Sequence, residues 1–132
     1  MSVAESQNPH FERIGGAANV VRLVDAFYDH MNRLPQAAGI RAMHGPDLEG
    51  IKALFVVYLT EWLGGPKEYS ARHGPPRLRM RHARFRIGPT ERDAWMACML
   101  GALDEVVPEP LLREQLGKAF LRTAEAIVNA SE

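Results

Sequence analysis

The stretch of this chain that decides its fold is residues 76–89, which read Pro76-Arg77-Leu78-Arg79-Met80-Arg81-His82-Ala83-Arg84-Phe85-Arg86-Ile87-Gly88-Pro89. One histidine stands among five arginines and four large apolar side chains, just ahead of a segment that carries Trp95. A neutral imidazole is a good axial ligand for haem iron. The arginines could pair with the two carboxylates of a porphyrin, and the apolar side chains could cover its face. Taken alone, the stretch is also compatible with a solvated basic loop or a phosphate-binding patch.

On either side of this stretch, apolar residues recur at three- and four-residue intervals, which is the spacing of one helix face. They predict four long helices with faces that run from Val20 to Leu34, from Leu48 to Trp62, from Trp95 to Val106 and from Leu112 to Val128. Asp47 is placed to cap the second of these helices and Pro89 to begin the third. A short helical turn is expected over residues 36–42. No β-type alternation interrupts the pattern, so the chain is predicted to be all-α.

Between Lys67 and Arg86 no period is sustained, and Gly74-Pro75-Pro76 interrupts the sequence. We therefore expect an irregular segment of roughly 20 residues with short turns, one of which holds His82. Ordinary connections between helices are much shorter. A segment of this length usually has a function, and holding a flat cofactor between helices would be one.

Composition predicts one packed domain, residues 11–132, after a flexible polar lead-in over residues 1–10. The chain has 132 residues, of which 46% are hydrophobic and 24% charged. Its 16 basic residues balance 16 acidic ones, so no overall field draws it to nucleic acid or to an anionic membrane. No secretory signal or membrane-spanning run is visible. The single cysteine, Cys98, cannot form an intramolecular disulfide, which fits a cytoplasmic location and indicates a buried thiol.

Five motifs follow one another along the chain: Gly15-Gly16, Phe27-Tyr28, Trp62-Leu63-Gly64-Gly65-Pro66, Arg77-Leu78-Arg79-Met80-Arg81-His82 and Glu91-Arg92-Asp93-Ala94-Trp95. This series resembles the truncated haemoglobins, and within them the second group, which a distal tryptophan marks. The resemblance runs from about Phe11 to Val128. It implies a two-over-two helical sandwich that encloses haem, in which the helices of Tyr28 and Phe55 face those of Trp95 and Phe120.

The resemblance also implies roles around the iron. His82 would be the proximal iron ligand, and Tyr28 and Trp95 would direct their O–H and N–H groups at a diatomic ligand on the distal side. His44 falls where this group usually carries an aromatic residue, tyrosine or histidine, that flanks the haem. Without the resemblance, Tyr28 and Trp95 would be interpreted as core aromatic residues. An indole N–H only donates, however, so a buried Trp95 must face an acceptor.

Eight further residues are expected to contact the haem: Ile51, Leu54, Phe55, Tyr69, Leu78, Arg81, Phe85 and Ile87. Arg81, with Arg79 as a second candidate, would pair with the propionates. The chain departs from the family pattern at two positions. Leu54 stands where many relatives have a basic residue that meets a propionate, and Ala83 stands where proline is common.

The function implied is binding of dioxygen, and of carbon monoxide and nitric oxide, at the ferrous iron of haem b (iron protoporphyrin IX). A polar distal pocket suits slow ligand release, and so oxidative or nitric oxide detoxifying chemistry; whether the protein is an enzyme stays open. The expected partner is a reductase, and binding to nucleic acid or to a membrane is not expected. The protein is expected to be a monomer or a homodimer. Two alternatives remain. One is an electron-transfer protein whose haem is ligated on both sides, by His82 and either His44 or Tyr28. The other is a haem-free helical module that binds anionic partners through Arg77–Arg86.

Overall fold

The computed structural model describes residues 9–131, which form helices, turns and loops and contain no strand. In chain order the elements are α2 (His10–Ile14), α3 (Ala17–Arg33), the 3-10 turn η1 (Pro35–Ala37), α4 (Ala38–Ala42), α5 (Glu49–Trp62), α6 (Glu68–His73), α7 (Leu78–Arg81), α8 (Pro89–Val106) and α9 (Pro110–Ile127). The predicted all-α class is therefore confirmed. None of these helices is both long enough and apolar enough to cross a lipid bilayer.

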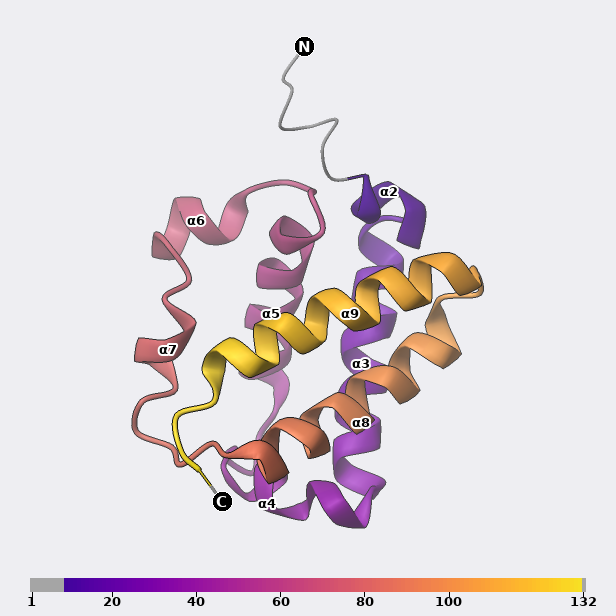
Figure 1. Ribbon diagram of the computed structural model, residues 1–132. Coiled ribbons are helices and arrows are strands. Elements are labelled where there is room, and N and C mark those ends of the chain that lie inside the picture. The colour runs from indigo at the N-terminus through magenta and orange to yellow at the C-terminus, as the bar shows by residue number, and fades with distance from the viewer. Residues whose placement is uncertain (1–8, 132) are drawn as a thin grey trace.

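The four long helices form two crossed layers (Figure 1). One layer contains α3 and α5 and the other contains α8 and α9, with α3 packed along α8. The short helices α6 and α7 lie at the side of the sandwich, on the left in Figure 1, next to α5 and to the C-terminal end of α9. This is the two-over-two arrangement that the sequence predicts.

The apolar face of α3 forms the centre of the core. Its buried side chains recur at the predicted helical spacing, and Val20, Val24, Phe27 and Met31 are each 2% exposed or less. Fully burying a large apolar side chain contributes about 1.5–3 kcal/mol relative to leaving it exposed. The periodicity of α3 therefore determines which of its faces meets α8.

The side chain of His30 on α3 approaches the backbone of α8 closely at Gly101. A Cβ atom at this position would lie 2.8 Å from Cε1 of His30, which is shorter than real Cβ contacts. The His30 ring also lies between the two helices with Nε2 2.7 Å from Glu105 Oε1. The absence of a side chain at Gly101 thus leaves room for the His30 ring where α3 meets α8.

Local sequence signals explain where the long helices begin. Pro89 is the first residue of α8, as predicted, and the N–H of the preceding Gly88 donates to Glu91 Oε1 at 2.7 Å. Leu48 occupies the N-cap position of α5, and Asp47 supplies the polar acceptor from one residue earlier. Its Oδ1 accepts a hydrogen bond of 2.9 Å from the N–H of Glu49.

The segment that the sequence predicts to be irregular contains only the two short helices α6 and α7. Arg77, which precedes α7, has φ 47°, and it is the one non-glycine residue with positive φ among residues 9–131. Since α7 ends at Arg81, His82 follows it directly.

Most of the predicted lead-in, residues 1–8, lies outside the described residues, as does residue 132. His10 already begins α2, so helical structure starts one residue before the expected domain boundary at residue 11.

Candidate functional site

A cavity of about 440 Å³ lies between the helical layers, and side chains from both layers line it. All twelve residues that the sequence singles out line this one cavity: Tyr28, His44, Ile51, Leu54, Phe55, Tyr69, Leu78, Arg81, His82, Phe85, Ile87 and Trp95. The fold thus brings together residues from α3, α5, α6, α7, α8 and the connections between them.

The ring of His82 is oriented by the helix that precedes it. Nδ1 lies 2.6 Å from the carbonyl oxygen of Leu78. Because a carbonyl only accepts, Nδ1 carries the proton and donates it. Nε2 then keeps its lone pair, and among the described residues nothing forms a hydrogen bond to it. An imidazole whose Nδ1 donates to a carbonyl and whose Nε2 has no protein partner next to a cavity is arranged as a metal ligand.

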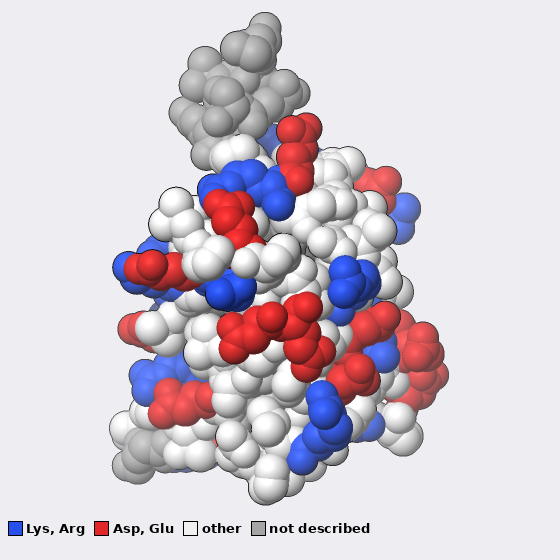
Figure 2. Space-filling model, turned by 90° about the vertical axis from the view of Figure 1, so that its right-hand side faces the viewer, with Lys and Arg blue, Asp and Glu red and all other residues white. Residues whose placement is uncertain are grey.

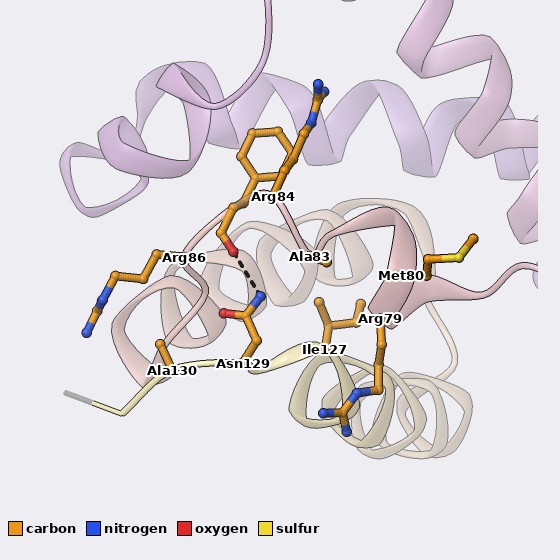
Figure 3. A pocket seen from close by; sticks show the side chains of 9 residues that line it. Arg79, Met80, Ala83, Arg84, Arg86, Ile127, Asn129 and Ala130 are labelled. Atoms are coloured by element: carbon orange, nitrogen blue, oxygen red, sulfur yellow. Dashed lines mark hydrogen bonds between the residues drawn. The ribbon is translucent and has the colours of Figure 1, made fainter.

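A second contact holds the loop after His82, and it comes from the far end of the chain. The Asn129 side chain donates to the carbonyl oxygen of Phe85 at 2.8 Å, as Figure 3 shows, and more weakly to that of His82 at 3.5 Å. Its Oδ1 accepts a hydrogen bond of 2.8 Å from the N–H of Ile87. Asn129 therefore secures the loop on the C-terminal side of the histidine, while α7 secures the N-terminal side.

Tyr28 and Trp95 reach the cavity from α3 and α8, on either side of the Phe27 ring. The Phe27 ring centroid lies 4.9 Å from that of Tyr28 and 5.2 Å from that of Trp95. Figure 1 shows α7, the helix before His82, at the edge of the molecule and α3 beyond α5. Tyr28 and His82 therefore belong to parts of the fold that lie on different sides of α5 in this view.

Both aromatic residues bring a hydrogen-bond donor that the protein does not use. Within residues 9–131, neither the Tyr28 hydroxyl nor the Trp95 indole N–H forms a hydrogen bond. Burial raises the pKa of the Tyr28 hydroxyl above its ordinary value of 10.0, so the group stays protonated at neutral pH. The cavity is thus supplied with two donors that lack acceptors.

His44 lies next to these donors, with its ring centroid 5.9 Å from that of Tyr28. Its Nδ1 is 2.9 Å from the carbonyl oxygen of Ile40, so Nδ1 donates and Nε2 keeps a lone pair. The side chain lines the cavity, as the sequence predicts.

Several lining residues were identified from the sequence only as helix-face residues. The largest are aromatic: Phe27, Tyr58, Trp62 and Phe120. Trp62 stacks on Phe120 with a centroid distance of 4.4 Å. Helical periodicity marks all four as inward-facing, but it cannot distinguish a residue that lines a cavity from one that is packed on every side.

The two arginines predicted to bind the propionates, Arg79 and Arg81, lie on different sides of α7. Arg81 lines the cavity; its Nε donates to the carbonyl oxygen of Pro76 at 2.7 Å, and its guanidinium lies 5.9 Å from the Tyr69 ring centroid. Arg79 instead lines a separate surface pocket. Residues two apart on a helix point in different directions. Arg84, from the loop after His82, lines the cavity together with Arg81.

The donor set of the cavity fits haem. Among the described residues, no group of three or more His, Cys, Asp or Glu side chains is placed to hold a bare metal ion. A metal bound at His82 must therefore take most of its ligands from a chelating group. A porphyrin supplies four nitrogens, its apolar rings match the aromatic walls, and its carboxylates match the arginines. An all-helical sandwich with this cavity defines a class of protein, the globins.

Comparison with known proteins agrees with this class. Residues 9–129 match the bacterial-like globin family. The chain is 35% identical to a group 2 truncated haemoglobin of Bacillus subtilis over 130 residues, which are 98% of this chain and 96% of that protein.

Solved structures are similar as well. A group II two-on-two haemoglobin of Agrobacterium tumefaciens superimposes with a TM-score of 0.87 at 45% identity, covering 92% of this chain and 94% of that one. The cold-adapted truncated haemoglobin of Pseudoalteromonas haloplanktis gives 0.89 at 40% identity, over 93% and 98% of the two chains. The chain belongs to the bacterial-like globins and, within them, to the group II truncated haemoglobins.

Proposed function

We propose that this haem-binding globin carries haem b with His82 Nε2 as the iron ligand, and that Tyr28 and Trp95 hold a diatomic gas in the distal pocket. The observation that carries the proposal is the pair of unused donors. Both donors belong to residues that line the cavity, and neither has a protein partner within residues 9–131. An acceptor bound in the cavity could therefore pair with both.

Ferrous haem, when bound, supplies an open coordination position for dioxygen, carbon monoxide or nitric oxide. The protein supplies orientation and polarity. The Leu78 carbonyl holds a proton on Nδ1 of His82 and so orients the ring, and Arg81 is available for a propionate. Ile51, Leu54 and Phe55 give the cavity an apolar wall.

A pocket with two donors retains a polar ligand for longer than an apolar pocket does. We therefore propose oxidative chemistry or nitric oxide detoxification, with a reductase that returns the haem to the ferrous state, in preference to oxygen delivery. The single buried cysteine fits a cytoplasmic location. The expectation of a monomer or homodimer stays a prediction.

A second candidate function has its own supporting observation. His44 Nε2 is free of protein hydrogen bonds among the described residues and lies on the cavity, just as His82 Nε2 does. Ligation by both histidines would give a low-spin haem suited to electron transfer. Family membership favours either haem function over a haem-free helical module.

The optical spectrum of the purified protein tests these functions. The expected result is a Soret band, a five-coordinate high-spin ferrous form and a normal carbon monoxide complex. His82→Ala should lose haem or show a severely altered ferrous spectrum. The matched control is His73→Ala, since His73 is exposed and lies outside the cavity. A normal haem content and carbon monoxide spectrum in His82→Ala would refute the assignment, and a low-spin ferrous parent would favour the bis-histidine protein.

A further inference from the structure

A cluster of positive charge lies in one segment of this chain, between Glu68 and Glu91. Residues 69–90 contain six arginines and neither aspartate nor glutamate, although the whole chain has 16 basic and 16 acidic residues. The segment forms most of α6, all of α7 and the loop to α8, on the left in Figure 1. Figure 2 shows the opposite side of the molecule, where basic and acidic side chains alternate. A neutral protein thus has one strongly basic side, which orients charged partners at a distance.

Four of these six arginines, Arg77, Arg79, Arg81 and Arg84, form no ion pair among the described residues. Arg77, Arg79 and Arg84 are exposed. By contrast, Arg72 lies 3.7 Å from Glu68, an acidic residue just outside the segment. The four arginines within residues 77–84 have no acidic side chain to offset their charges, so they would attract an acidic surface brought against them.

The centre of this basic surface is a concave pocket lined by both polar and apolar side chains. Met80 is 61% exposed, more than any other large hydrophobic side chain among the described residues. It borders a pocket of about 590 Å³ whose lining includes Ala83, Phe85 and Ile127. Exposed methionine and arginine side chains are enriched at protein interfaces.

The arginines around the pocket do not form a site for a small anion. In Figure 3 the side chains of Arg79, Arg84 and Arg86 extend in three different directions from the pocket. A single phosphate or carboxylate would therefore meet one of them at a time. A broad acidic surface could meet several at once.

The pocket is separated from the larger cavity by one layer of side chains. Arg84, Phe85 and Ile127 line both the surface pocket and the cavity of His82. A molecule seated in the surface pocket would therefore lie one side chain away from the haem cavity, on the side of the histidine loop.

We propose that the basic surface of Arg77, Arg79, Met80 and Arg84 docks the acidic face of a small one-electron donor protein, of the iron–sulfur or flavin class. This rests on the proposed function, because the electron acceptor is ferric haem in the adjoining cavity. The reduced partner loses one electron and the ferric haem gains it, with no covalent bond made or broken. The thin wall of Arg84 and Phe85 lies between donor and acceptor.

Charge reversal away from the haem cavity tests the docking. Arg77→Glu/Arg79→Glu changes two residues that do not line that cavity. Arg22→Glu/Arg33→Glu is the matched control: it makes the same change in net charge on exposed positions of α3. Each haem-loaded protein is mixed in a stopped-flow instrument with a reduced acidic [2Fe–2S] ferredoxin, and reduction of ferric haem is followed at several ferredoxin concentrations.

Electrostatic steering raises association rates by roughly 10- to 1,000-fold. The basic-surface variant should therefore react at least about tenfold more slowly than the parent at low salt, and the control within about twofold of it. Salt near 0.5 M should remove the difference, since the screening length falls well below its value of about 10 Å at 0.1 M. An unchanged rate in Arg77→Glu/Arg79→Glu would overturn the proposal.

Two further measurements separate this proposal from the proposed function. Haem content, ferric spectrum and reduction by a neutral photoreduced flavin should be the same in all three proteins. Absence of haem would instead refute the proposed function.

Oxidised ferredoxin added to the ¹⁵N-labelled protein should shift amide signals of residues 77–86 and 127–130. Shifts confined to other regions, or tighter binding to duplex DNA or to phosphatidylglycerol vesicles than to ferredoxin, would contradict the docking of an electron donor.

Discussion

Replacing Trp95 by phenylalanine is the most direct test of the distal donors. The Trp95 ring lies 5.2 Å from the Phe27 ring and 5.9 Å from the Phe120 ring, and a phenyl ring keeps most of this packing. The substitution removes the indole N–H, which has no acceptor among residues 9–131. It therefore isolates the contribution of one donor to the binding of the gas.

The magnitude follows from the strength of a hydrogen bond to a charged acceptor, about 1.5–3 kcal/mol. If dioxygen must break this bond to leave, its release should be roughly 10- to 150-fold faster in Trp95→Phe, at tenfold for about 1.4 kcal/mol. Carbon monoxide is less polar when bound and should respond much less. Tyr28→Phe should act in the same direction, and the two effects should not add, because both donors meet one ligand.

Stopped-flow measurement of dioxygen dissociation from the two single variants and the double variant tests these numbers. Trp62→Phe is the matched control, because Trp62 lines the same cavity but stacks on Phe120 at 4.4 Å. Its dissociation rate should stay within about threefold of the parent. If Trp95→Phe releases dioxygen at the parental rate while Tyr28 is intact, Trp95 is a packing residue and the account of the distal donors fails.

Two further substitutions and one change of pH test other features of the structure. Arg81→Ala should speed haem transfer to an apo-globin acceptor at low salt. The ferrous spectrum should not change, because an ion pair between Arg81 and a propionate is exposed, screened and distant from the iron. Equal transfer rates in parent and variant would show that Arg81 binds no propionate. Asn129→Ala removes two hydrogen bonds from the loop after His82, so urea unfolding should show a loss of about 1–3 kcal/mol, and an unchanged midpoint would contradict the role of Asn129. Burial raises the pKa of the Cys98 thiol to about 11, from 9.0 when exposed. The thiol therefore ionises at a lower pH in the unfolded chain, so the free energy of unfolding should fall as the pH rises from about 9 to 11. Iodoacetamide at pH 9 should label the folded protein at least about tenfold more slowly than the unfolded one. Equal labelling rates would mean that Cys98 is accessible.

The sequence predicts the long helices well because each buries one regular face. Val20 to Met31 on α3 lie at the expected spacing and are buried, and Pro89 begins α8 where its fixed φ is tolerated. The same periodicity could not reveal a cavity. Tyr28 and Trp95 were assigned to a ligand pocket only through the family motif, since their spacing also fits a solid core.

Contacts between distant segments leave no local signal. Arg79 and Arg81 are similar in sequence, and only the geometry of α7 shows that one lines the cavity and the other the outer pocket. Arg84 at the cavity wall and Asn129 beside the histidine loop could not be found from periodicity, because each acts through its position in space. In the sequence, Asn129 is one polar residue after a helix, and such residues are common whether or not they bind another segment.

The bonds between Asn129 and the histidine loop have a consequence for the order of events during synthesis. Asn129 is 47 residues beyond His82, so the loop cannot gain these bonds until that length of chain has been translated and has left the ribosome. At 5–20 residues per second this takes roughly 2–10 s. During that interval His82 is already present while its supporting contacts are absent, so haem captured by a nascent chain would be held without them. Stable capture is therefore a late step, completed when the C-terminal residues close onto the loop.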